Sequence, residues 1–158
     1  MATLTVTITE NVSLNGVDQG GSYSGFTNSN ITQVMRKIIR CTAGSEMTLY
    51  QAADATATTG TGAAWFDEDS IKYVRITNLD PDDHYGYIRI QNSEGTPDEV
   101  SYKFYGKQSL LLYSHDTSFN AGSGGALTLG TGEGDIEKVS FKGITDAQEI
   151  EIFIASAD

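Results

Sequence analysis

The chain has very few of the residues that build disulfides, metal sites and acid–base sites. Among its 158 residues there is one cysteine, Cys41, and there are two histidines. A single cysteine excludes an intrachain disulfide framework and argues against a zinc site built from thiolates. We therefore expect Cys41 to be a small buried hydrophobic residue, and we expect little proton transfer or metal binding by histidine.

Long hydrophobic runs and basic residues are also scarce. No segment approaches the ~20 apolar residues that cross a bilayer, and the N-terminus lacks the pattern of a signal peptide. Ten Lys and Arg residues against 21 Asp and Glu residues give a formal net charge of -11. A nucleic acid or an anionic membrane would meet a repulsive field, so neither is expected as a partner, and we expect a soluble product made in the cytoplasm.

The chain is rich in glycine and in short alternating segments. It has 17 glycines and only 2 prolines, which is typical of a β protein with many tight turns. In the first segment Leu4, Val6 and Ile8 fall on one side of an extended strand and threonines fall on the other. The sequence predicts an all-β fold in a single domain spanning residues 1–158.

Alternating segments recur along the rest of the chain and predict about nine or ten strands, more than one small sheet holds comfortably. The expected fold is an antiparallel β-sandwich of the jelly-roll or immunoglobulin-like kind. Besides 71–93, described next, the predicted strands are 46–50, 100–106, 109–113, 126–129, 136–143 and 149–155.

The clearest predicted hairpin covers residues 71–93. Segments 71–79 and 85–93 are expected to pair across a turn at 80–83. Their inward-facing residues would be Val74, Ile76, Ile88 and Ile90.

Two predictions concern the N-terminal third. The dipeptide Asn15-Gly16 suits the positive φ angles of a type I′ turn and predicts a hairpin there. The small polar stretch 20–30 is interpreted as a loop, from which Tyr23 and Phe26 could turn back onto the body or face a partner.

Residues 31–42 fit both a helix and a strand. The turn-like 43–45 and the alternating 46–50 favour a strand from about Arg36 onward. The small-residue stretch 52–64 is interpreted as a long loop, and Trp65 and Phe66 close it beside the acidic residues 67–69. A structural anchor is the more common role for such an aromatic pair, and a binding platform is the alternative.

No catalytic, cofactor-binding or metal-binding residue can be assigned. Ser114-His115-Asp116 has the residue types of a hydrolase triad, but neighbours on one strand point to opposite faces and cannot converge. His84 lies in a polar turn and is expected to be exposed. Asp80, Asp82 and Asp83 offer oxygen ligands for calcium but lack the rest of an EF-hand loop.

Three segments together resemble small virion structural proteins of tailed bacteriophages, especially those of marine cyanophages. They are T-x-T-I-T-E-x-V-x-L-N-G at 5–16, YVRITNLD at 73–80 and the terminal IEIFIASAD at 150–158. The resemblance implies a non-enzymatic capsid decoration or cement protein in the virion, bound to the major capsid protein or other virion proteins. It also implies a homo-oligomer, with a trimer favoured, and no cofactor; a tail or fibre component is the neighbouring alternative.

A glycan-binding module is the alternative from another class. Sugar rings stack on exposed aromatic residues, and Trp65, Tyr85 and Tyr87 are the candidates for that contact. As possible surface contacts of any kind, the sequence offers Trp65, Phe66, Tyr85 and Tyr87. A hydrolase of unrecognised type is the weakest hypothesis, since no two acidic residues are singled out.

Overall fold

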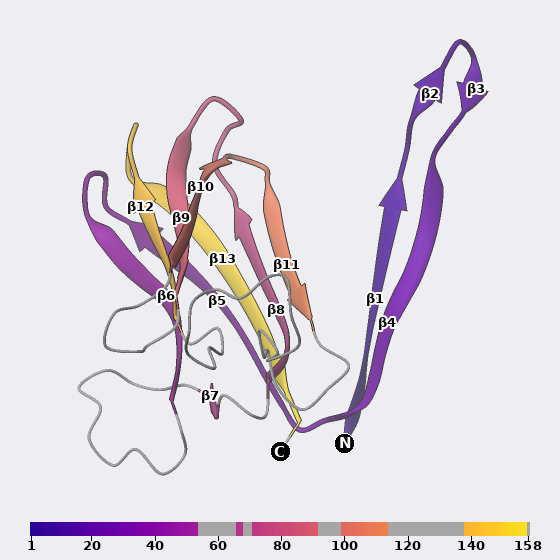
Figure 1. Ribbon diagram of the computed structural model, residues 1–158, viewed down its shortest axis with the longest axis horizontal. Helices are drawn as coiled ribbons and strands as arrows, with labels where there is room; N and C mark the ends of the chain where they lie inside the picture. Colours follow the sequence, from indigo (N-terminus) through magenta and orange to yellow (C-terminus); the bar gives the residue numbers. More distant parts are fainter. Residues whose placement is uncertain (54–65, 68–70, 92–98, 114–137, 158) are drawn as a thin grey trace.

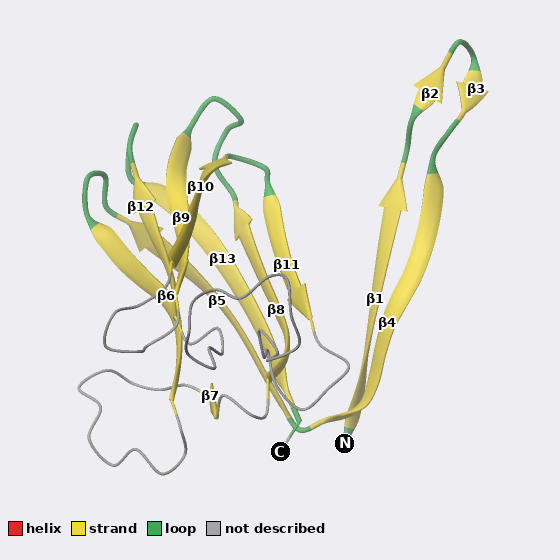
Figure 2. Cartoon of the chain, viewed as in Figure 1, coloured by secondary structure: helices red, strands yellow, loops and turns green. Residues whose placement is uncertain are grey.

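The computed structural model describes residues 1–53, 66–67, 71–91, 99–113 and 138–157. All regular structure in these residues is β-strand, and none of it is helix (Figure 2). Two sheets pack face to face as a sandwich, and a long two-stranded arm projects away from it (Figure 1). The described chain has no helix long and apolar enough to span a membrane.

The first sheet of the sandwich is antiparallel and has the strand order β11-β8-β13-β5. Strand β13 is central, because it pairs with β8 on one side and β5 on the other. The strands are β5 (Gln33–Cys41), β8 (Ile71–Asn78), β11 (Ser109–Tyr113) and β13 (Gln148–Ser156).

The second sheet has the strand order β10-β9-β12-β6-β7. Its pairings are antiparallel except for the two-residue contact of β7 with β6, which is parallel. The strands are β6 (Glu46–Ala53), β7 (Phe66–Asp67), β9 (Tyr85–Gln91), β10 (Glu99–Tyr105) and β12 (Lys138–Gly143).

The main core lies between the two sheets. Alternate residues of β13 are fully buried there, and Phe141 of β12 packs against Phe104 of β10 with ring centroids 6.4 Å apart. Burial of such side chains is the main favourable term in folding. The fully buried members of this cluster include Leu49, Ile71, Ile76, Ile88, Val139, Phe141, Ile150, Ile152 and Ile154.

The arm is a hairpin built from the first 31 residues. Strand β1 (Ala2–Glu10) pairs antiparallel with β4 (Gly21–Ile31), and the short strands β2 (Ser13–Leu14) and β3 (Val17–Asp18) form its tip. The tip turn confirms the prediction, because Asn15 and Gly16 have φ angles of 53° and 77°.

The predicted loop at 20–30 is wrong, because this segment is most of strand β4. Its small polar residues are typical of a loop, but here they lie on the solvent side of a two-stranded ribbon. A register shift opposite Val6 and Ile8 also breaks the alternation that would have revealed a strand. Phe26 does pack onto the body, whereas Tyr23 is 62% exposed.

The predicted hairpin at 71–93 is also wrong in its pairing. Both strands exist, but β8 belongs to the first sheet and β9 to the second. Val74, Ile76 and Ile88 are buried as expected and Ile90 is partly buried. Strands from two facing sheets bury the same alternate residues as neighbours in one sheet, so the pattern could not separate these arrangements.

Residues 31–42 are extended rather than helical. Strand β5 begins at Gln33, three residues before the predicted start, and the turn at 43–45 leads into β6 as expected. Gly44 adopts a φ of 77° in that turn. The strand predicted at 126–129 lies outside the described residues.

Candidate interaction surfaces

One face of the arm carries an apolar stripe that is only partly covered. Val6 pairs with Phe26, and Ile8 pairs with Tyr23 one step nearer the tip. Since alternate residues of a strand share a face, Ile8 continues the side of the ribbon to which Val6 belongs. Phe26 is 2% exposed, whereas Ile8 and Tyr23 are 40% and 62% exposed. The covering of the stripe therefore ends between these two pairs.

The covered half of the stripe packs on the outer face of the first sheet. The Phe26 ring lies 6.4 Å from Tyr73 and 5.3 Å from Tyr113, measured between centroids. This second cluster comprises Phe26, Ile31, Tyr73 and Ala155, with Leu4, Val6, Leu111 and Phe153 packed at its edge. It attaches the base of the arm to strands β8, β11 and β13.

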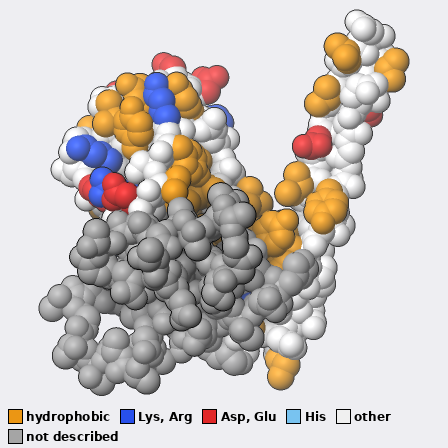
Figure 3. All heavy atoms as spheres, in the orientation of Figure 1, with side chains coloured by type: hydrophobic (Ala, Val, Ile, Leu, Met, Phe, Trp, Pro, Cys, Tyr) orange, Lys and Arg blue, Asp and Glu red, His pale blue; other side chains and the backbone are white. Residues whose placement is uncertain are grey.

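The uncovered half extends to the tip. Leu14 and Val17 face each other across the turn and are 61% and 56% exposed, and Val12 is 52% exposed. The space-filling view shows hydrophobic side chains along the projecting arm, which stands clear of the sandwich (Figure 3). Large apolar side chains gathered on one projecting element are typical of an interaction site.

Among the described residues, large apolar side chains are also exposed on the outer face of the first sheet, along its edge strand β5. The register places Val34 beside Ala155 and Ile38 beside Glu151 on this face. Val34 and Ile38 are 56% and 55% exposed. An exposed edge strand offers unpaired backbone groups as well as side chains, and proteins usually protect such an edge.

A buried carboxylate organises the middle of this outer face. The Glu151 side chain is 6% exposed and accepts hydrogen bonds from Arg36 and Arg75, which flank it on β5 and β8. The Arg36 Nε to Glu151 Oε2 distance is 2.7 Å. The two guanidinium groups balance the buried charge and fix the side chains of three neighbouring strands.

A cavity of about 240 Å³ lies between the arm and this face. Leu4 and Val6 line it from the arm, and Tyr73, Arg75 and Phe153 line it from the sheet. Leu4, Val6, Tyr73 and Phe153 belong both to the second cluster and to the lining of the cavity. The arm therefore begins to separate from the sheet at the edge of this cluster.

The outer face of the second sheet carries a cluster of tyrosines. Tyr85 and Tyr87 have ring centroids 6.4 Å apart, and Tyr105 lies 5.7 Å from Tyr85. The Lys103 ammonium lies 3.7 Å from the Tyr85 ring centroid, a cation–π contact. Hydrogen bonding to Tyr105 raises the pKa of Lys103. Tyr87 is 44% exposed, so its ring is available on this face.

A polar pocket of about 210 Å³ lies beside these tyrosines. Arg89 at its centre is 3.3 Å from Glu46 and 3.6 Å from Glu99, and the Ser140 hydroxyl donates to Glu46 at 2.5 Å. The pocket is lined by Glu46, Tyr87, Arg89, Ser101, Ser140 and Lys142. Its groups can both donate and accept hydrogen bonds around a small polar ligand.

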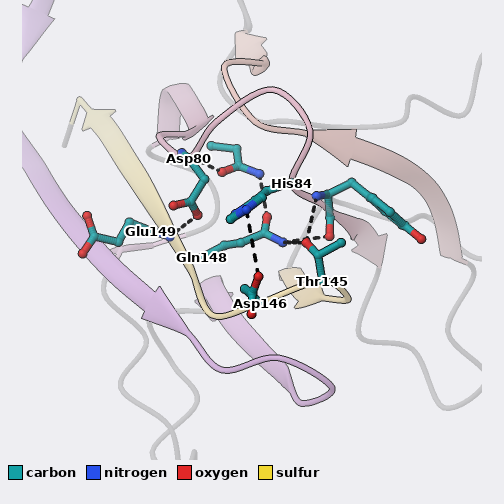
Figure 4. A network of polar contacts seen from close by, with 8 residues as sticks. Asp80, His84, Thr145, Asp146, Gln148 and Glu149 are labelled. Atoms are coloured by element: carbon teal, nitrogen blue, oxygen red, sulfur yellow. Dashed lines mark hydrogen bonds and ion pairs between the residues drawn. The ribbon is translucent and has the colours of Figure 1, made fainter.

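A third group of polar residues, at one end of the sandwich, has a structural role (Figure 4). Buried Gln148 accepts from Asn78 at 2.8 Å and donates to the backbone oxygen of Tyr85 at 2.7 Å. Asp80 accepts from the backbone N–H of Glu149 at 2.9 Å. These bonds join the β8–β9 connection to the β12–β13 turn. Both connections run from one sheet to the other.

The residues considered for chemistry do not assemble into a site in the described structure. Asp80 is used by the network above, and no group of three potential metal ligands occurs among the described residues. His84 is partly buried rather than exposed, and its Nε2 lies 3.9 Å from Asp146 Oδ2. Ser114, His115 and Asp116 lie outside the described residues.

Of the predicted contact residues, some lie in the described structure and some lie outside it. Tyr85 and Tyr87 lie together on the second sheet. Phe66 is described only through its backbone, in β7, and Trp65 and most of the 52–64 segment lie outside the described residues. Cys41 is fully buried, as expected, and burial raises its pKa to about 11.

Sequence reasoning missed two surfaces on which large apolar side chains are more than half exposed, the arm tip and the outer side of β5. A signal for the first was present: Val12, Leu14 and Val17 surround a tight Asn15-Gly16 turn. So few residues around such a turn cannot bury these side chains by themselves.

The comparisons with known proteins leave the family open. No protein-family model matches the chain, and no curated protein matches it in sequence.

Proposed function

We propose that this chain is a non-enzymatic structural protein of a tailed-bacteriophage virion, a decoration or cement protein of the capsid. Its partners would be the major capsid protein and further copies of itself, assembled as a trimer. The observation that carries the proposal is the projecting arm, whose tip residues Leu14 and Val17 are exposed. A folded monomer gains nothing from such an element, whereas an assembled particle gains a contact.

Two further observations support a role through surface contacts. The sequence resembles phage virion proteins in three separate segments, as described above. The outer side of β5 also exposes the apolar residues Val34 and Ile38, a second surface that suits contact with another protein.

The first test is the mass of the purified chain by light scattering over a range of concentrations, with and without calcium. A stable trimer or larger ring that does not depend on calcium is the expected result. A monomer at every concentration would contradict the trimer and would leave either a decoration protein that orders only on its capsid or a glycan-binding module.

Location in the virion needs a second experiment. Antibodies against the chain would be applied to phage particles whose genome encodes it and viewed by electron microscopy. Label on the heads is expected; label on tails would favour the tail or fibre alternative, and particles without label would overturn the virion assignment.

A glycan-binding function is the second candidate, favoured by the exposed Tyr87 beside the pocket around Arg89. An aromatic ring next to paired donors and acceptors suits a sugar ring and its hydroxyls. A glycan array would test it: binding that is lost in Tyr87→Ala and retained in Tyr23→Ala would support a sugar site on this sheet. Absence of binding to any glycan would remove this candidate.

A further inference from the structure

We infer that the arm is exchanged between copies: its distal half, residues 8–23, lies along the outer side of β5 in a second copy of this chain. The inference rests on the proposed structural role and specifies which surfaces make the homo-oligomer.

The first argument is that the receiving face already binds this kind of element. The sheet face formed by β8, β13 and β11 is covered by the base of the chain's own arm through Phe26. The strip along β5 continues the same face in register, since Val34 lies beside Ala155 of the covered cluster. Half of one continuous surface is thus occupied by a ribbon, and the other half is open.

The second argument is that the chain's own arm cannot fill the open half. Its base is fixed on the β8–β11 side of the face, and from there the arm leads away from the sandwich (Figures 1 and 3). Within the described residues, the exposed apolar side chains of the distal arm and those of β5 therefore do not cover each other in one chain. A second copy supplies a partner for each of them.

The third argument is charge. Residues 1–31 contain two acidic residues, Glu10 and Asp18, and no lysine or arginine. Strand β5 contains three of the ten basic residues of this acidic chain, and two of them, Arg36 and Arg40, share its outer side with Val34 and Ile38. In the described structure Arg36 binds Glu151, whereas Arg40 is exposed and has no ion pair there. Opposite charges on the two surfaces favour their association and oppose pairing of arm with arm.

The geometry of exchange favours a closed assembly. Each copy gives one arm and receives one on a different patch, so the exchange closes either reciprocally in a two-fold dimer or head-to-tail in a ring such as the proposed trimer. Such a ring would also cover the edge strand β5, whose backbone groups are otherwise open to pairing with other chains.

Cross-linking between differently tagged copies tests the contact directly. Leu14→Cys in one copy and Ile38→Cys in the other would be co-expressed and treated with a short bis-maleimide. Cys41 is buried, so it leaves the background low. A product containing both tags is expected, and pairing Leu14→Cys with Ile144→Cys, an exposed apolar position outside both surfaces, should give none.

The outcomes separate this inference from the proposed function. An oligomer by light scattering without the Leu14–Ile38 product, or with products of Leu14→Cys copies alone, would overturn arm exchange and leave the structural role standing. A monomer by light scattering would overturn arm exchange, whereas particles without antibody label would overturn the proposed function.

Substitutions on the two surfaces test their contribution to association independently of cross-linking. Ile38→Asp, and separately Leu14→Asp with Val17→Asp, should each raise the concentration for half-association about tenfold or more, because both remove buried apolar contacts. Ile144→Asp is the matched control and should not. Unchanged association in both arm and β5 variants would contradict the inference.

Discussion

The sandwich and the arm are built from the same kind of strands but are held in place in different ways. Strands of both sheets of the sandwich bury side chains in the core between them, and Ile150, Ile152 and Ile154 are completely inaccessible. The arm is a two-stranded ribbon along its length, and in the described structure it is buried against the sandwich only at its base, where Phe26 lies. An isolated two-stranded hairpin is marginal in water, so the order of the arm depends on what it contacts. The difference suggests that the sandwich provides stability and that the arm provides association.

The largest effect should come from the core of the sandwich. Phe141→Ala removes a fully buried ring that packs on Phe104, and should lower the free energy of unfolding by about 3–5 kcal/mol. Urea denaturation followed by circular dichroism measures it. Leu14→Ala at the arm tip is the matched control and should change stability by less than about 0.5 kcal/mol. Equal effects would mean that the tip is part of the folded core.

The base of the arm should behave as the boundary between the two parts. Phe26→Ala removes the ring that contacts Tyr73 and Tyr113, and should cost about 2–3 kcal/mol, a value below that of a core phenylalanine because only the docking of the arm is lost. Hydrogen exchange should accelerate in β1 and β4 and stay unchanged in β13. Tyr23→Ala, at an exposed arm position, should leave exchange in the base as it is. Faster exchange throughout β13 would show that arm and sandwich unfold together.

The ion pairs on the outer face should contribute less than either apolar cluster. Glu151→Gln removes the charge that holds Arg36 and Arg75, and should cost about 1–2 kcal/mol because the carboxylate is buried while both arginines stay partly in water. Glu149→Gln, an exposed position on the same strand and face, should change the free energy of unfolding by less than about 0.5 kcal/mol. Chemical denaturation of the two variants gives the comparison, and equal values would show that burial of Glu151 has no consequence.

The sequence predicted the sandwich better than the arm, for a physical reason. Segments 71–79 and 149–155 carry apolar residues at alternate positions that face the core, such as Val74 and Ile76 in the first, and both are strands in the structure. Strand β4 has almost no buried face along its length, so polar residues are tolerated and its pattern becomes that of a loop. The alternation of apolar and polar residues arises from burial of one face of a strand. It therefore cannot identify a strand that is exposed on both faces.

Pairing between strands was harder to predict than the strands themselves. The β8–β9 error arose because side-chain alternation is the same whether the next strand lies beside or opposite. The decisive groups are buried polar ones, Asn78 and Gln148, which hold the crossing connection and which no local pattern marks. The interaction surfaces were missed for a related reason: an exposed apolar residue acquires meaning only once its neighbours in space are known.

The smallest change in stability should come from substitution of two glycines that have the same φ in turns of the arm and of the sandwich. These two substitutions compare the two parts of the chain most directly. Gly16 at the arm tip and Gly44 in the β5–β6 turn both have a φ of 77°, a conformation that costs alanine about 1 kcal/mol, and neither has another group near the position of a Cβ. Gly44→Ala should therefore lower the free energy of unfolding of the sandwich by about 1 kcal/mol, because that turn joins two of its strands. Gly16→Ala should leave the same transition unchanged and speed hydrogen exchange in β2 and β3 alone. If both substitutions lowered the global stability equally, the tip would have to be coupled to the core, and the division of the chain into a stable sandwich and an associating arm would be wrong.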